Sequence, residues 1–330
     1  MGVDRMNDNI PYGLRFLPYL PSRNELDGFP EVLQRVKTAV PKEFSDNDIK
    51  VLVGALKKLG PKCKMIVEIG INRNCSEDPN AVDYVGNNST RQLIDHKEEE
   101  CIYLGIDINR TNVDTINKDY DNNDTVVAVC IDSSNTDTIE QIFKSTGCDK
   151  IDLLHIDGHH SVIQVIKDWK LVRNLSSHGI VVLHNTNHHP GPTQILKAID
   201  RDMFKVKRYY AERKDDWGIS TAERIPTIRE VINNYFLAFN DHSIEELSKL
   251  MSEDVCLVDW DINVKGKENV MTAVKSIFEK APDINIKVEN VSVNSNNAAC
   301  EIVINQDLKV VDLLQINEDR KITNIKAYKQ

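Results

Sequence analysis

Four short apolar segments, each ending at a glycine or an acidic residue, constrain the fold of this chain more than any other feature. They are Val67-Glu68-Ile69-Gly70, Leu104-Gly105-Ile106-Asp107, Val129-Cys130-Ile131-Asp132 and Leu154-His155-Ile156-Asp157. Runs of this kind, rich in β-branched residues and separated by helix-like stretches, are typical of buried parallel strands in an α/β sheet. Ligands of such open sheets bind beyond the carboxyl ends of the strands, so we expect a site where these segments end.

The 330-residue chain is long enough for two domains, and its hydrophobic pattern changes near residue 222. Strands alternate with helices before this point. After it, helices come first and a run of strands follows, which is an order typical of an α+β fold. We therefore expect an N-terminal arm and helices over residues 1–59, a Rossmann-like α/β domain over 60–221 and a second, α+β domain over 222–330. Residues 221–226 read as the linker between them.

The expected elements of the first domain follow from apolar periodicity and from turn residues. The helices are expected at 30–40, 45–58, 89–96, 136–146, 162–175 and 193–202, and the strands at 65–70, 101–108, 126–131, 151–157, 179–184, 204–212 and 217–219. Trp169 lies at helical spacing from apolar residues, so we expect it to pack in the core.

Composition excludes several classes of function. The 41 basic and 51 acidic side chains give a net charge of −10 with no basic stripe, which disfavours nucleic-acid binding. The seven cysteines are widely spaced without a C-x-x-C pair, which argues against a disulfide framework and a zinc finger. No signal peptide is recognisable, and no apolar run approaches the roughly 20 residues that span a bilayer. We expect a cytoplasmic protein that acts on a small molecule and binds neither nucleic acid nor membrane.

The first three strand ends suit a nucleoside cofactor. Gly70 lets the backbone approach a ligand because it has no Cβ, and the Asp107 carboxylate can accept hydrogen bonds from a ribose diol. Asp132 and Ser133 place a carboxylate and a hydroxyl where they can hold an adenine edge. The G-x-G-x-x-G pattern is absent after Gly70, which disfavours a cofactor with a pyrophosphate.

Histidines gather around the last of these strand ends and the next one. Seven of the nine histidines lie between residues 155 and 189, several of them directly after the fourth and fifth expected strands. Imidazole titrates near neutral pH, so it suits a general base that removes a proton from a substrate hydroxyl. The candidate catalytic residues are His160, His184 and Asp157.

These strand ends together resemble class I S-adenosylmethionine-dependent methyltransferases. More narrowly, they are similar to the group that includes macrolide-sugar O-methyltransferases and cephalosporin-hydroxylase-like proteins. The quoted residues are Glu68-Ile69-Gly70, Asp107, Asp132-Ser133, Ile156-Asp157-Gly158-x-His160-Ser161 and the run from Gly179 to His184, within residues 60–220. The resemblance implies an enzyme that uses S-adenosylmethionine to methylate a hydroxyl group of a small metabolite.

The resemblance also implies a place for each residue. The methionine part of the cofactor would lie beside Glu68, Gly70, Asn72, Ser89 and Thr90. Asp107 would bind the ribose, and Asp132 and Ser133 the adenine. Relatives in this group often hold a divalent cation after strands four and five.

The corresponding residues here are Asp157, His184 and Asn185. Because Mg²⁺ prefers oxygen ligands whereas imidazole favours transition metals, the sequence leaves both the use and the identity of a metal open.

The second domain resembles the cone-shaped NTF2-like, or SnoaL-like, fold. The resemblance rests on Tyr235-Phe236-Leu237-Ala238-Phe239, Val258-Asp259-Trp260 and Ile322 to Tyr328. Such domains include enzymes and dimerisation modules, so we expect a homodimer or higher homo-oligomer, and a cone that Tyr235, Asp259 and Asp261 could line. Two alternatives to a methyltransferase stay open, which are a metal-dependent hydroxylase-like enzyme on the same scaffold and a non-catalytic protein that binds a small ligand.

Overall fold

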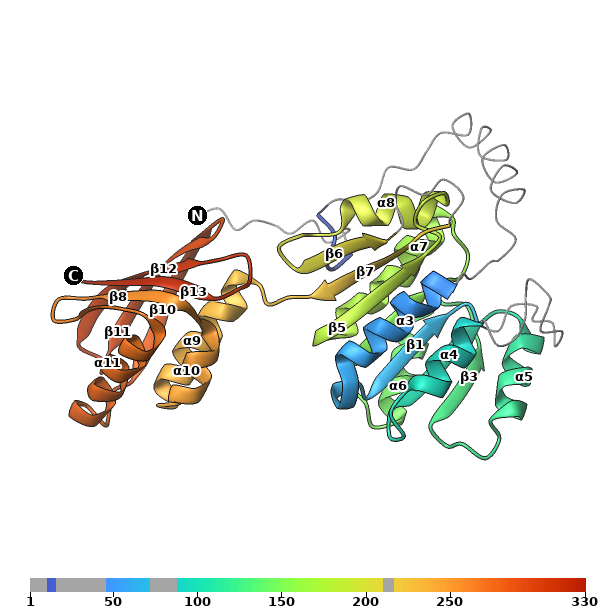
Figure 1. Ribbon diagram of the computed structural model, residues 1–330, viewed down its shortest axis with the longest axis horizontal. Coiled ribbons are helices and arrows are strands. Elements are labelled where there is room, and N and C mark those ends of the chain that lie inside the picture. The colour runs from blue at the N-terminus through green and yellow to red at the C-terminus, as the bar shows by residue number, and fades with distance from the viewer. Residues whose placement is uncertain (1–10, 16–45, 72–87, 210–216) are drawn as a thin grey trace. The chain divides into compact units, whose positions relative to one another are not determined.

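The protein is described from a computed structural model, which places residues 11–15, 46–71, 88–209 and 217–330. The chain divides into two compact units, Met1–Arg224 and Ile225–Gln330 (Figure 1). The helix expected over 30–40 and the candidate residue Asn72 lie outside the described residues.

Unit 1 contains a seven-stranded sheet with the order β3-β2-β1-β4-β5-β7-β6. The strands are β1 Met65–Ile69, β2 Ile102–Asp107, β3 Val126–Cys130, β4 Ile151–Ile156, β5 Leu175–His184, β6 Phe204–Tyr209 and β7 Ile219–Arg224. β1 to β5 pair in parallel, and β7 runs antiparallel between β5 and β6. The predicted Rossmann-like α/β fold is confirmed. The chain leaves the sheet centre in opposite directions from β1 and from β4, so the switch point lies between these two strands.

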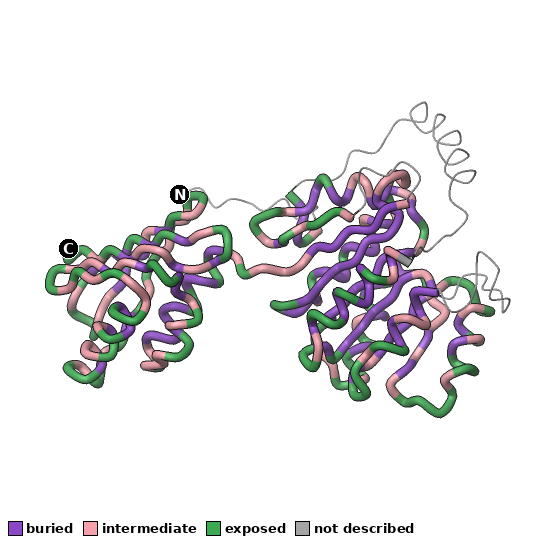
Figure 2. The backbone as a smooth tube through the Cα atoms, viewed as in Figure 1, coloured by how far each residue is buried: buried purple, intermediate pink, exposed green. Residues whose placement is uncertain are grey.

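Helices cover both faces of this sheet. One face is covered by α3 Asp46–Leu59, α4 Ser89–His96 and α5 Arg110–Asp119, and the other by α6 Thr136–Ser145, α7 Val162–Trp169 and α8 Pro190–Ala198. Short 3-10 turns occupy Gly60–Lys62 and Lys170–Asn174. Successive side chains of β1 alternate between the two cores, with Ile66 in one and Val67 in the other. The central strands are therefore buried along their length (Figure 2).

The buried aromatic Trp169 confirms its predicted packing role. Its side chain is fully buried against Phe204, and its indole N–H donates to the carbonyl of Tyr12 at 2.9 Å. A buried indole needs such an acceptor, because an unsatisfied N–H in the core costs free energy.

One expectation for unit 1 was wrong, and one helix was missed. The expected linker at 221–226 is largely strand β7, in which Ser220, Thr221 and Ala222 are buried. Their small and polar side chains suggested a loop, but β7 is sandwiched between two strands and its Ser220 hydroxyl pairs with that of Thr186 at 2.9 Å. Helix α5 was not anticipated, because only Val113 and Ile116 form its buried stripe.

Unit 2 is an α+β fold, as predicted. Its sheet has the order β10-β11-β12-β13-β8-β9. The strands are β8 Met251–Val258, β9 Asn263–Lys265, β10 Ile286–Asn294, β11 Asn297–Ile304, β12 Leu308–Ile316 and β13 Ile322–Lys329, and the helices are α9 Ile228–Asn240, α10 Ile244–Leu250 and α11 Lys267–Lys280. A capping box fixes the start of α9, where Thr227 and Glu230 bond to each other's backbone N–H groups.

Candidate functional site

The switch point is built on a close backbone contact between the ends of β1 and β4. Gly70 has φ of +84°, and a Cβ at this position would lie 2.4 Å from the carbonyl oxygen of Asp157 and 2.8 Å from Cα of Gly158. Only glycine satisfies both the left-handed backbone and the close approach. The Gly70 N–H donates to Ile106 at 2.9 Å, and the Asp157 N–H donates to Ile69 at 2.9 Å. The ends of β1, β2 and β4 therefore meet at one edge.

Asp107 lies at this edge with most of its acceptor positions filled. Its Oδ2 accepts from the Ile71 N–H at 3.1 Å and from Asn112 Nδ2 at 3.2 Å, and its Oδ1 accepts from the Asn109 N–H at 2.8 Å. A carboxylate offers about four acceptor positions, so one remains for a ligand hydroxyl.

Asp132 and Ser133, which follow Ile131 at the end of β3, present oxygens near this edge. The backbone N–H of Ser134 donates to Asp132 and lowers the pKa of this carboxyl. Ser133 is buried, and its hydroxyl donates to Asp168 Oδ1 at 2.6 Å. The role of Asp168 was missed, because nothing in the sequence distinguishes it from the other acidic residues on helices.

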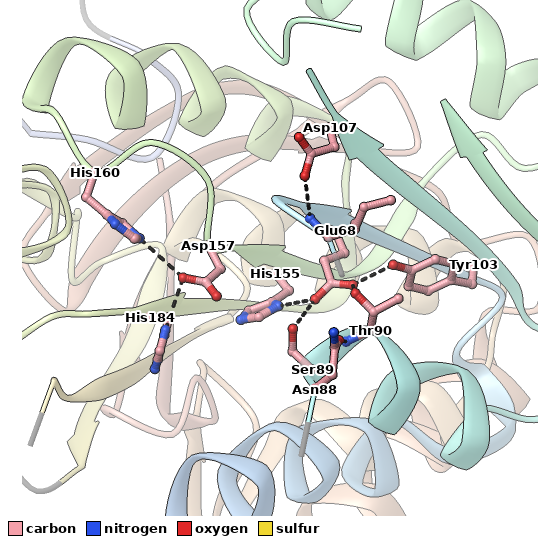
Figure 3. A network of polar contacts seen from close by, with 11 residues as sticks. Glu68, Asn88, Ser89, Thr90, Tyr103, Asp107, His155, Asp157, His160 and His184 are labelled. Atoms are coloured by element: carbon pink, nitrogen blue, oxygen red, sulfur yellow. Dashed lines mark hydrogen bonds and ion pairs between the residues drawn. The ribbon is translucent and has the colours of Figure 1, made fainter. Parts of the chain in front are cut away.

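Three of the residues predicted beside the methionine part of the cofactor, Glu68, Ser89 and Thr90, lie together and hydrogen-bond to one another. Glu68 is fully buried and accepts from Ser89 Oγ at 2.6 Å and from Thr90 Oγ1 at 2.8 Å (Figure 3). Its carboxylate also bonds to the Tyr103 hydroxyl and, at 2.9 Å, to His155 Nδ1. These four contacts occupy the acceptor capacity of the carboxylate. Glu68 thus ties the end of β1 to α4, β2 and β4 through buried hydrogen bonds.

The reacting half of the site is a buried chain of histidines and carboxylates. Asp157 Oδ1 lies 3.2 Å from His160 Nε2 and 3.0 Å from His184 Nδ1 (Figure 3). The second nitrogen of His184 lies 3.6 Å from Asp48 Oδ2, which α3 brings to the site. Burial by itself lowers the pKa of His184, but the charges and hydrogen bonds of Asp157 and Asp48 outweigh it and raise the pKa to about 10. Asp48 was missed in the sequence analysis, because more than half of the sheet domain separates it from His184 along the chain.

Asn185 adds strain and an unsatisfied acceptor to this half. It adopts φ of +59°, which is uncommon for a residue other than glycine. Its Nδ2 lies 3.3 Å from His160 Nε2, and its buried Oδ1 has no hydrogen-bond partner among the described residues. Strained residues and buried unsatisfied groups concentrate at functional sites, because the surrounding fold maintains them.

Aromatic rings extend this half of the site. The ring of His160 lies 4.5 Å from that of His189, and His189 stacks on Trp217 at 5.2 Å. The Asn187 N–H donates to the Trp217 carbonyl at 2.8 Å, so the loop after β5 and the segment before β7 form one wall. Neither Trp217 nor this stack was predicted. His159, by contrast, is exposed and bonds locally to a serine hydroxyl.

The residues present do not fit a metal ion. A search of residues 11–15, 46–71, 88–209 and 217–330 finds no group of three or more His, Cys, Asp or Glu side chains that could hold one. Both nitrogens of His184 face carboxylates, and the amide nitrogen of Asn185 faces His160. The donors of the expected set, Asp157, His184 and Asn185, therefore already engage neighbouring side chains.

Unit 2 contains a buried carboxyl group whose pKa is raised, that of Asp312. Asp312 of β12 is 5% exposed. Burial, followed by the charge of Asp259, raises its pKa to about 7. Tyr235 of α9 is also buried, and burial and the charge of Asp312 raise the pKa of its hydroxyl. Asp312 was missed, whereas the expected Asp261 is exposed in a turn.

The opposite face of this second sheet is open. Leu313 and Tyr328 are 41% and 53% exposed on it. A groove of about 520 Å³ crosses it, and its lining side chains include Asn294, Asn297, Gln315, Asn324 and Lys326.

Comparison with known proteins assigns unit 2. The SnoaL-like domain family matches residues 228–322. A SnoaL-like protein of unknown function from Burkholderia thailandensis is 13% identical, covering 31% of this chain and 94% of that one with a TM-score of 0.30. An NTF2-like protein of unknown function from Cytophaga hutchinsonii is 16% identical, covering 32% of this chain and 90% of that one with a TM-score of 0.28.

A search of curated proteins finds no match to this chain. Among the described helices, none combines the length and the apolar character needed to cross a bilayer. The chain thus joins a Rossmann-like α/β domain to a C-terminal SnoaL-like domain.

Proposed function

We propose that this chain is an S-adenosylmethionine-dependent methyltransferase that acts on a hydroxyl group of a small molecule. The observation that carries the proposal is the meeting of two chemically different halves at the Gly70–Gly158 contact. Asp107 and Asp132 present carboxylates on one side, and Asp157 holds a histidine on the other. A seven-stranded sheet with an antiparallel β7 is compatible with this class of enzyme.

In the cofactor half, this chain's residues bind and orient. One remaining acceptor position of Asp107 would take a ribose hydroxyl, while Asp132 and Ser133 would take the amino group of adenine. Glu68, through its bonds to Ser89 and Thr90, holds the strand that presents Gly70. The bound cofactor supplies an already activated methyl group, so the protein mainly aligns the acceptor with it.

In the reacting half, His160 would remove the proton from the acceptor hydroxyl. Asp157 Oδ1 lies 3.2 Å from Nε2 of His160 and orients the ring, as carboxylates orient histidine bases elsewhere. The Nδ1 of His160 faces the amide nitrogen of Asn185 at a longer 3.4 Å, and it would take the proton in place of that contact. His184 was predicted as a second candidate base, but both its nitrogens already face carboxylates. Its contribution is to fix Asp157. The buried Asn185 Oδ1, which has no hydrogen-bond partner among the described residues, would accept a hydrogen bond from the substrate.

Titration calorimetry with S-adenosylhomocysteine tests the cofactor half. Asp107→Ala should weaken binding by about 1–3 kcal/mol, because a hydrogen bond to a charged group is lost. Asp114→Ala is the matched control, since Asp114 is an exposed carboxylate on the neighbouring helix α5. Absence of binding to the wild-type protein, or an equal effect of the two variants, contradicts the assignment.

Transfer of a labelled methyl group to a panel of hydroxylated small molecules tests the reacting half. His160→Gln should abolish transfer while cofactor affinity is retained. His159→Gln should leave transfer unchanged, because the His159 side chain is exposed and its contact is with the hydroxyl of Ser161, two residues along the chain. Binding of cofactor without turnover by the wild-type protein would instead favour the non-catalytic alternative.

A second candidate function belongs to unit 2, and Asp312 is the observation that favours it. A buried carboxyl with a pKa of about 7 is suited to taking and returning a proton near neutral pH. Isomerisation of β,γ-unsaturated ketones, followed by the absorbance of the conjugated product, tests this activity. Activity that is absent, or that survives Asp312→Asn, contradicts it.

We further propose that unit 2 pairs two copies of the chain. Its open sheet face exposes Leu313 and Tyr328, which are large apolar side chains on adjacent strands β12 and β13. Apolar side chains grouped on one face often mark a protein–protein contact.

A further inference from the structure

A buried carboxylate fixes the direction of the Ser133 hydroxyl. The Ser133 Oγ–H donates to Asp168 Oδ1 at 2.6 Å, and an ionised carboxylate can only accept. Gln164 Nε2 donates to the same Asp168 oxygen at 2.9 Å and to Ser133 Oγ at 3.0 Å. The Ser133 proton is therefore committed to Asp168, and the hydroxyl oxygen has one lone pair left.

Both polar side chains after β3 consequently present acceptors alone. The remaining lone pair of Ser133 can accept a hydrogen bond but cannot donate one. Asp132 is also an acceptor, because the Ser134 N–H stabilises its ionised form. A ligand edge that meets these two oxygens must supply a donor. An edge that supplies a carbonyl oxygen would leave three acceptors facing one another without a proton.

A contribution to fold stability does not explain why Asp168 is buried. Its side chain is fully buried on α7, and its second oxygen, Oδ2, has no hydrogen-bond partner in the described part of the chain. A buried carboxylate with one unsatisfied oxygen destabilises the fold compared with an apolar residue of similar size. This cost is consistent with a role of Asp168 at the site where Ser133 would meet a ligand.

We propose that Asp168 is a positioning residue that acts through Ser133 and makes the nucleoside pocket selective for a 6-amino purine over a 6-oxo purine. The inference rests on the proposed function, because that function places the purine at Asp132 and Ser133. Adenine offers its exocyclic amino group as the donor that both oxygens require. Hypoxanthine offers an oxygen at the same position and is rejected.

Titration calorimetry at pH 8 with S-adenosylhomocysteine and its 6-oxo analogue, S-inosylhomocysteine, tests this inference. The wild-type protein should prefer the amino compound by about 10- to 100-fold, the range expected for hydrogen bonds to such groups. Asp168→Leu frees the Ser133 proton to meet the 6-oxo group, so the preference should fall by about 10-fold. Ser133→Ala should lower the preference as well.

A double-mutant cycle separates action through Ser133 from a general disturbance. Asp168→Leu should change the preference in the wild-type background and should leave it unchanged in the Ser133→Ala background. An effect that persists without the Ser133 hydroxyl overturns the inference, as does a wild-type protein that binds both compounds equally. If Asp168→Leu does not fold, an unchanged preference in Ser133→Ala alone overturns it. A wild-type protein that binds neither compound contradicts the proposed function itself, and the inference falls with it.

Discussion

The contact between Gly70 and the end of β4 makes a sharp prediction about stability. In Gly70→Ala, the added methyl group would lie 2.4 Å from the carbonyl oxygen of Asp157 and 2.8 Å from Cα of Gly158. Both are backbone atoms, so no side chain can rotate to relieve the clash. The backbone at Gly70 has φ of +84°, a second source of strain for any residue with a Cβ.

Gly147 offers a matched control for the second effect. Its φ is +85°, but a Cβ there would meet nothing within 4 Å. Gly147→Ala should therefore cost only the left-handed backbone, about 1–2 kcal/mol. The entropy that alanine removes from the unfolded chain is common to both variants and cancels in the comparison. Gly70→Ala should cost a further 1–3 kcal/mol or so, the usual range for overpacking.

Differential scanning calorimetry of the full chain measures this difference. For a domain of the size of unit 1, an extra 1–3 kcal/mol corresponds to a melting temperature lower by about 2–12 °C. Cofactor affinity, measured on the folded variants, should fall only for Gly70→Ala, because only this change displaces the end of β4. Equal melting temperatures for the two variants would refute the reasoning that β1 and β4 meet through this contact.

Three further predictions concern the buried network and unit 2. Because the pKa of Asp312 rises from its ordinary 3.8 to about 7 on folding, the folded state holds an extra proton between these values. The free energy of unfolding should therefore fall as the pH rises from about 4 to about 7, by at most about 1.4 kcal/mol per pH unit, and Asp312→Asn should flatten this part of a urea-denaturation series. Glu68→Gln replaces an acceptor oxygen by a donor that faces hydroxyl donors, so it should lower the free energy of unfolding by about 1–3 kcal/mol in the same assay, and an unchanged value would contradict the four-contact network. Leu313→Glu should convert a homodimer to a monomer by light scattering, whereas a wild-type monomer would remove the proposed pairing.

Local sequence was sufficient for the order of the elements and for the residues at the strand ends. The apolar runs that finish at Gly70, Asp107 and Asp157 identified parallel strands, because strands buried on both faces read as continuous apolar stretches. The predicted strand order also placed these residues at one edge of the sheet, because the carboxyl ends of neighbouring parallel strands lie at the same edge. Sequence failed at β7, where small polar residues resemble a linker and only pairing with two flanking strands shows them to be buried.

The directions of side chains and their distant partners were decided by the tertiary structure alone. Glu68 was predicted beside the cofactor, and its pairing opposite His155 of β4 places its carboxylate in a buried network with His155 that the sequence did not indicate. Asp48 on α3 contacts His184 in the reacting half, and Asp168 on α7 contacts Ser133 in the cofactor half. Neither carboxylate can be told from a solvated surface carboxylate in the sequence. Sequence determines which chemical groups follow each strand, because that depends on local order. Which of them meet, and which way a proton points between them, depends on contacts that form only when helices pack on the sheet.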